Sequence, residues 1–260
     1  MRRRVRVLLT LFGLCAAPAA GAQTHHRVSA FEPTDLELED PLTLELDMQF
    51  GVLKRDGDPN LRVFVPDFEL DFGLTSRVEL DIDGAFSFDR QSGRFTFGRD
   101  NLWVATKLGF YADQDPLDPE RAWALGAQIG PRLPTSPHSA GTGFGAVVLG
   151  ARMAPPWHLV ANAGVMLEPI DRTQALRSCA VVGGLDLDYD LDADDRWSLL
   201  AELAAGYSFG PDPHDVHATL GVGFSATPHL DLSVVGYYGF LAGGDRAGLF
   251  LGVTPKFGPS

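Results

Sequence analysis

The stretch Arg77–Phe88 reads RVELDIDGAFSF, and its side chains change character from one residue to the next. One parity carries the apolar or small residues Val78, Leu80, Ile82, Gly84, Phe86 and Phe88. The other begins with Arg77 and carries three acids. Successive side chains of a strand point to opposite faces, so the pattern predicts a strand with one oily face and one acidic face. It leaves open whether the oily face contacts a protein core or lipid.

The first residues predict an export signal. Four arginines precede Val7–Ala17, a short apolar run, and Ala20-Gly21-Ala22 has the small-x-small form of a cleavage site. The run is shorter than the roughly 18 residues that a membrane-spanning helix requires. We therefore expect residues 1–22 to be a signal peptide that is removed on export.

Composition excludes several classes of protein. The chain has 34 acidic against 21 basic residues and a formal net charge of −13, which argues against nucleic acid as a partner. Of its two cysteines, Cys15 is expected to leave with the signal peptide, so Cys179 has no partner for an internal disulfide. The remaining choices are a soluble exported β protein and an outer-membrane barrel.

Stretches of period-2 alternation recur along the chain. We expect strands at 41–52, 62–74, 77–88, 102–112, 122–133, 143–153, 156–168, 181–192, 196–209, 215–226, 229–241 and 247–257. Pro66 interrupts the second stretch, which predicts a bulge there or a later start. The sixth, 143–153, is apolar on both parities, so its orientation stays undetermined.

Strand length and loop length favour a barrel. Most of the stretches have 10 to 14 residues, whereas soluble strands most often have about 5–6 and tilted membrane-spanning strands about 9–11. Short connections mostly alternate with longer ones, as in bacterial barrels, although the connection at 112–121 breaks the rule. Aromatic residues near strand ends are expected to form interface girdles: Trp103, Trp123, Trp157, Trp197, Tyr207, Tyr238 and Phe257.

A sheet in lipid cannot leave an edge unpaired, because hydrocarbon offers no partner for backbone polar groups. The sequence therefore predicts an all-β fold, a transmembrane antiparallel β-barrel of about 12 strands in residues 41–260. Residues 23–40 are expected to form a short N-terminal periplasmic segment. The expected location is the outer membrane of a Gram-negative bacterium, with outer-membrane lipid around the barrel.

Three motifs carry a family resemblance: FELDFGLTSRVELDIDG (68–84), NLWVATKLGF (101–110) and RLPTS (132–136). They resemble a family of bacterial outer-membrane proteins named for the MetA pathway of phenol degradation, whose members are described as transporters. Residues that fit are Gly73-Leu74-Thr75, Glu79, Lys107, Pro134-Thr135 and the aromatic Phe257 of the last strand. Ala105 and Ser136 stand where glycine is usual, and three residues follow Phe257.

The resemblance implies a twelve-stranded barrel and uptake of small, often hydrophobic or aromatic solutes. We also expect the barrel-assembly machinery to recognise the C-terminal strand that ends at Phe257.

Charged residues gather on one parity of the predicted strands. Basic residues on a lipid face cost about 2–4 kcal/mol at the membrane centre and acids somewhat less, so the lumen is their expected side. Candidate lumen-lining residues for transport are Glu45, Asp47, Glu69, Asp71, Glu79, Asp81, Asp83, Lys107, Arg132, Asp186 and Asp188. They indicate either a negatively lined pore that favours cations or a wet interior, neutralised by its basic residues, without an open path.

Signals for other chemistry are weak. His158 and Asn162 share the inward parity and could belong to a barrel lipase or esterase, but Ser198 and Ser233 lack a nucleophile motif. His214 and His217 point to opposite faces of a strand, which argues against a zinc site. We expect no catalysis, no metal and no cofactor. The predicted function is passive passage of small solutes; a barrel hydrolase and a structural barrel without transport are the alternatives.

Overall fold

The computed structural model describes residues 38–55, 61–91, 94–115, 118–172, 177–192, 196–209, 214–241 and 245–258. The predicted signal peptide, residues 1–22, and residues 23–37 lie outside these ranges. Across the described ranges, the chain offers no helical segment with the length and apolarity needed to traverse a bilayer.

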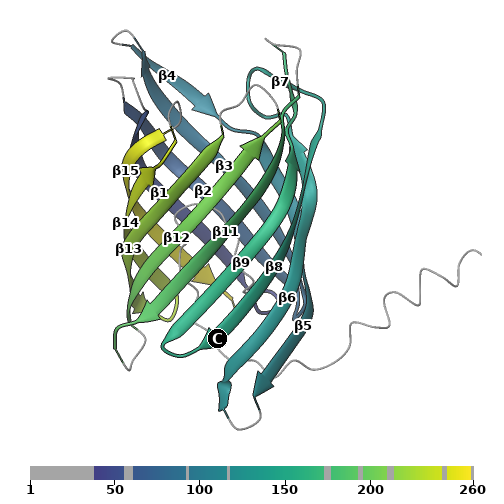
Figure 1. Cartoon of the computed structure of the whole chain (residues 1–260), viewed down its shortest axis with the longest axis vertical. Coiled ribbons are helices and arrows are strands. Elements are labelled where there is room, and N and C mark those ends of the chain that lie inside the picture. The colour runs from purple at the N-terminus through teal and green to yellow at the C-terminus, as the bar shows by residue number, and fades with distance from the viewer. Residues whose placement is uncertain are drawn as a thin grey trace, which may run out of the picture.

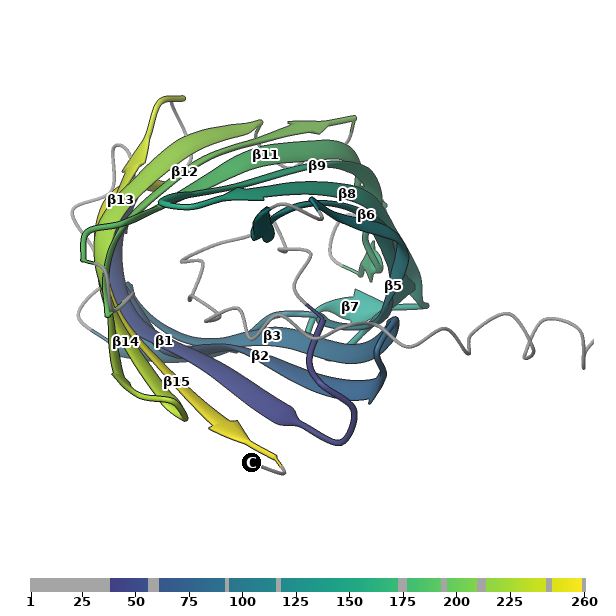
Figure 2. The ribbon, with the colours of Figure 1, turned by 90° about the horizontal axis from the view of Figure 1, so that it is seen from below.

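The described part of the chain is built from strands. They are β1 (Leu44–Arg55), β2 (Leu61–Thr75), β3 (Val78–Gln91), β4 (Arg94–Arg99), β5 (Leu102–Asp115), β6 (Asp118–Leu133), β7 (Ser139–Ala140), β8 (Gly143–Ala154), β9 (Trp157–Leu167), β10 (Ile170–Asp171), β11 (Cys179–Asp190), β12 (Trp197–Ser208), β13 (Asp215–Thr227), β14 (Leu230–Gly239) and β15 (Asp245–Phe257). Twelve of them form a closed antiparallel barrel, since β1 pairs with β15 on one side and β2 on the other, and β2 pairs with β3. Figures 1 and 2 show this single curved wall.

The remaining strands belong to the connections at one end of the barrel. β4 extends the hairpin after β3, and β7 pairs with β10. In Figure 1, β4 and β7 lie at the top and the C-terminus at the bottom. Short turns, such as 76–77 and 155–156, lie at the bottom end, which we assign to the periplasm because bacterial barrels keep their short turns there.

All twelve predicted spans correspond to barrel strands, and two details are now explained. The register of β2 shifts between Phe64 and Asp67, so Pro66 lies in a bulge rather than at a strand end. The prediction of a long connection at 112–121 was wrong. Most of this segment belongs to β5 and β6, which form an extended hairpin and remain paired as far as Asp115 and Asp118.

The two faces of the wall differ sharply in exposure. Val148 is 62% exposed and its chain neighbour Leu149 is 0% exposed. No second layer covers the wall in the described structure, so a buried side chain there points into the lumen. β8, which the sequence left without orientation, therefore turns Val147 and Leu149 inward and Phe144 and Val148 outward.

The outward face forms a continuous apolar belt. Its exposed members include Phe50, Val52, Leu125, Val165, Leu185, Leu203, Leu220, Val234, Leu249 and Leu251. Burial of such a belt in hydrocarbon is favourable, whereas its exposure to water is not. The oily face of the opening stretch thus contacts lipid, and the protein is an outer-membrane barrel.

Six of the seven predicted girdle aromatics are exposed, but the prediction for Trp103 was wrong. Trp103 is 1% exposed, and its Nε1 donates a hydrogen bond to the Gly130 carbonyl at 3.2 Å. It shares the parity of Ala105 and Lys107, which are also buried. Proximity to a strand end therefore did not indicate the lipid interface; parity determined the direction of this ring.

A charge placed in the middle of the apolar belt tests the lipid assignment. Val234 lies near the centre of β14 and is exposed on the outer face. We expect Val234→Arg to lower the free energy of unfolding in lipid vesicles by about 2–4 kcal/mol, because a guanidinium at mid-membrane depth must be desolvated. Leu241→Arg, just beyond the end of β14, should cost about 1 kcal/mol or less. Equal stability of both variants would contradict the assignment.

Candidate lumenal site

Acidic side chains of three neighbouring strands form an acidic band on the inner wall. Its members are Glu45, Asp47, Asp67, Glu69, Asp71, Glu79, Asp81 and Asp83, from β1, β2 and β3. Register places them side by side: Glu45 opposes Asp71, which opposes Asp81. Glu45, Glu79 and Asp81 are at most 1% exposed. The structure thus brings together the predicted acids of these strands.

The bulge at Pro66 sets the direction of the β2 acids. Phe64 precedes the bulge and points inward, where it packs with Leu53, Ala85 and Phe250. After the inserted residue, the odd-numbered positions Asp67 to Asp71 face inward. Without that insertion the acids would lie on the lipid side, since one residue of slip exchanges the faces of a strand.

Lys107 of β5 is the basic residue at the centre of this region. Its Nζ lies 2.8 Å from Glu79 Oε1, and both side chains are almost fully buried. On β6, Gln128 Nε2 donates a hydrogen bond of 2.7 Å to Asp81 Oδ2. A buried ion pair needs such close geometry to offset desolvation of its charges.

A second basic group lies at the periplasmic end. Lys256 Nζ of β15 lies 2.9 Å from Glu39 Oε1 and 2.8 Å from Glu45 Oε2. The Glu39 backbone N–H donates to Glu79, so the chain before β1 lies against the inner wall. Gly73 permits this approach, because a Cβ at that position would collide with the backbone of Asp40.

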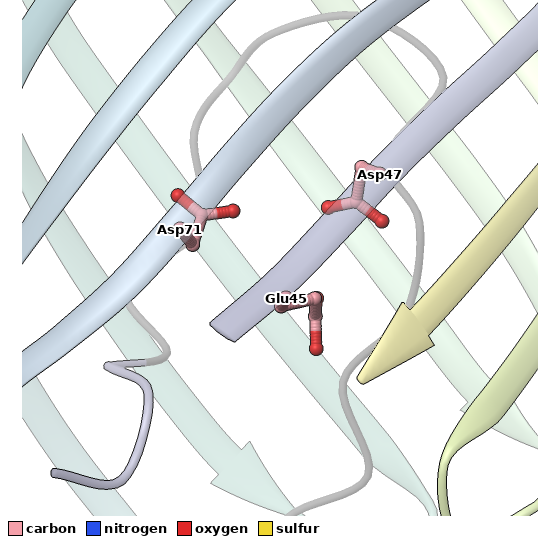
Figure 3. A group of neighbouring side chains, drawn as sticks. All are labelled: Glu45, Asp47 and Asp71. Atoms are coloured by element: carbon pink, nitrogen blue, oxygen red, sulfur yellow. The ribbon is translucent and has the colours of Figure 1, made fainter. Parts of the chain in front are cut away.

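Asp47 and Asp71 lie next to Glu45 (Figure 3). Thr254 Oγ1 donates to Asp47 Oδ1 at 2.5 Å, which connects the band to β15. One carboxylate oxygen each of Glu45, Asp47 and Asp71 lies within 4.8 Å of the other two. Two lysines, Lys107 and Lys256, thus serve this part of the described inner wall, against eight acids of the band.

The other predicted lining residues lie elsewhere on the inner wall. Asp186 and Asp188 of β11 are half-buried, and Asp186 opposes Glu202 of β12. Arg132, at the outer end of β6, has its Nε 2.8 Å from Glu168 Oε1. Asp186 and Asp188 therefore lie outside the acidic band, whereas Arg132 opposes Trp103, which in turn opposes Asp83 of the band.

An apolar cluster covers another part of the inner wall. It consists of the buried side chains Trp103, Ala105, Val147, Leu149, Ala151 and Met166, from β5, β8 and β9. Figure 2 shows β8 and β9 across the lumen from β1 and β2. The acidic band and this apolar cluster thus occupy different parts of the inner wall.

His158 carries the hydrolase hypothesis, and its surroundings do not fit a triad with Ser198. His158 Nε2 lies 3.2 Å from Asp190 Oδ2, and Asp190 opposes Ser198 in the β11–β12 register. The acid thus lies on the strand between histidine and serine, whereas a catalytic triad needs the histidine between acid and serine.

Several inner-wall residues were missed by the sequence reasoning. Gln128, Glu202 and Lys256 all occupy the parity opposite the apolar residues of their strands, so alternation could have found them. His217 is also inward: its Nδ1 lies 2.5 Å from Asp215 Oδ2, and Thr219 Oγ1 donates to Glu202 Oε2 at 3.2 Å. No periodic signal could have found Glu39, which precedes the first strand.

Comparison with known proteins supports the fold. No family model matches the chain, and no curated protein matches it. Among solved structures, the NanC porin is similar with a TM-score of 0.57 and 10% identity, over 82% of this chain and 100% of that chain. The β-domain of the Bordetella autotransporter BrkA has a TM-score of 0.48 and 15% identity, over 83% of this chain and 100% of that chain. The NanC likeness shows an outer-membrane barrel fold.

Removal of Lys107 tests whether the acidic band depends on this cation. We expect Lys107→Met to lower the free energy of unfolding by about 3–5 kcal/mol, because Glu79 would be left charged and buried. The double variant with Glu79→Gln should regain part of that loss in equilibrium unfolding. Arg132→Met, in the more exposed pair with Glu168, should cost less. Equal costs at the two pairs would contradict the buried-pair argument.

Proposed function

We propose that this barrel is a passive outer-membrane channel whose acidic lumen favours cations and small positively charged or neutral solutes. The observation that carries the proposal is the acidic band on the inner wall of a closed barrel. The band has eight carboxylates, and in the described part of the chain Lys107 and Lys256 contact it, so we infer a negative field on that side of the lumen. A negative field in a low-dielectric wall raises the local concentration of cations and repels anions.

The lumenal acids differ in exposure, and we assign a different role to each of the two groups. Glu69, Asp83, Asp186 and Asp188 are half-buried, so a solute in the lumen can reach them. Glu45, Asp71, Glu79 and Asp81 are buried and act through the field. We also propose that the chain belongs to the phenol-degradation transporter family that it resembles. Membership would add small hydrophobic or aromatic compounds to the candidate solutes. The NanC porin, named as a porin, supports a channel through its fold alone.

Ion selectivity in planar bilayers tests the proposal. Under a potassium chloride gradient we expect single-channel conductance with a reversal potential that shows cation preference. The triple variant Asp47→Asn, Asp71→Asn, Asp81→Asn should shift the reversal potential toward zero, because three inward carboxylates lose their charge.

The matched control is Asp192→Asn, the same chemical change in the turn after β11. Asp192 Oδ1 accepts hydrogen bonds from the Arg196 and Trp197 backbone N–H groups, and the asparagine oxygen can accept them as well. We expect this variant to keep the parent's reversal potential. Anion preference in the parent, or a barrel that inserts without conducting, would refute the proposed channel.

A further inference from the structure

Two carboxylates of the acidic band face each other directly across neighbouring strands. Asp71 of β2 opposes Asp81 of β3, and Glu69 lies two residues before Asp71 on the same face. Oxygen atoms from these three carboxylates all lie within 4.8 Å of one another. Like charges directly opposite in a sheet are destabilising, so this arrangement needs a compensating partner.

Burial sharpens this requirement. Asp71 is 4% exposed and Asp81 is 1% exposed. The Oδ1 atom of each is buried and accepts no hydrogen bond from the described residues. A buried carboxylate oxygen without a donor loses its hydration without replacement, which is energetically unfavourable.

Two described donors, the Gln128 amide and the Lys107 ammonium, lie near the three carboxylates. Gln128 gives its Nε2 to Asp81 Oδ2, and Lys107 Nζ lies 2.8 Å from a fourth carboxylate, Glu79. The other polar atom of Gln128, its Oε1, is also buried and accepts no hydrogen bond from a described residue. The oxygen atoms of the three carboxylates converge as acceptors, and oxygen is the ligand type that hard cations prefer.

We propose that Glu69, Asp71 and Asp81 bind a calcium ion on the inner wall. Calcium accepts six to eight oxygen ligands at about 2.3–2.6 Å, so ligands on opposite sides of the ion lie about 4.8 Å apart. Glu69 is half-buried, which leaves that side open to the lumen for entry of the ion and for water ligands. Zinc is disfavoured, because histidine and cysteine are absent from the three-carboxylate group.

A neighbouring trio provides the internal comparison. Glu45 and Asp47 also approach Asp71, but Lys256 contacts Glu45 and Thr254 donates to Asp47. Protein donors therefore already serve that trio, which places the ion on the Asp81 side of Asp71. The sequence could not show which acids form the site, since it contains many alternating acids and does not distinguish one pair from another.

The experiment is calcium titration of the purified full-length barrel in detergent after treatment with a chelator. Isothermal titration calorimetry with calcium chloride should show one saturable site. We expect Asp71→Asn and Asp81→Asn each to weaken affinity about tenfold or more, because each removes a charged ligand. Asp47→Asn and Asp186→Asn, the same change in the neighbouring trio and on β11, should stay within about twofold of the parent.

Terbium luminescence gives an independent readout. Trp103 opposes Asp83 in the β3–β5 register, two residues along β3 from Asp81. Terbium bound at the site should therefore be sensitised by this indole and displaced by calcium. Trp103→Phe should reduce the luminescence while leaving the calcium titration unchanged.

The proposal is overturned if the folded parent shows no saturable calcium binding, if Asp71→Asn and Asp81→Asn bind as well as the parent, or if Asp47→Asn loses affinity and Asp81→Asn does not. Heat-modifiable gel migration verifies folding of every variant. If Asp71→Asn does not fold, Asp81→Asn and Glu69→Gln decide the question. Because the titration needs no conduction, failure of the channel proposal would leave its result intact, and the reverse also holds.

Discussion

The hydrogen bonds between β1 and β15 close the sheet, and every other feature depends on that closure. Their register runs from Leu44 opposite Phe257 to Arg55 opposite Asp245, so the two ends of the barrel domain meet. An open edge in hydrocarbon would leave a row of backbone N–H and C=O groups without partners, each at a cost of several kcal/mol. Closure removes both edges and creates two separate environments, lipid outside and a lumen inside.

Closure also explains how so many charges can occupy strands that cross a membrane. Alternation directs one residue of every two into the lumen. There Lys107 and Lys256 contact acids on the strands paired with their own, and Gln128 contacts an acid one strand further away. Gln128 of β6 reaches Asp81 of β3 across the intervening β5. Concave curvature shortens such distances on the inner side only. The charged network is thus a property of the closed barrel rather than of any one strand.

Much of the fold could be predicted because lipid requires apolar residues on the outer face of each strand, and this requirement produces alternation with a period of two. The twelve spans and the inward parity of the β1–β3 acids follow from that pattern alone. β8 could not be oriented, since Val147 and Leu149 face a packed apolar cluster in the lumen while Val148 faces lipid. Trp103 was misplaced for the same reason: an aromatic ring suits either environment, and position along the strand says less than parity.

The local detail of the site lay beyond the sequence. Alternation indicates which acids face inward, but it carries no information on which of them share a cation or a donor. The pairing of Glu79 with Lys107 depends on the β3–β5 register, and the contact of Glu39 with Lys256 depends on how the chain enters the barrel. The proline predicted either a bulge at Pro66 or a later strand start, and the register showed that β2 has the bulge.

Collision accessibility along β3 would test the account most directly. A nitroxide spin label would be placed at each position from 79 to 86, in a Cys179→Ser background, with the barrel in lipid vesicles. The account predicts that oxygen, which concentrates in hydrocarbon, collides most often with labels at Leu80, Ile82 and Phe86 and least at Glu79, Asp81 and Asp83. Accessibility without this period of two, or access of a water-soluble nickel complex to Leu80 and Ile82, would contradict it.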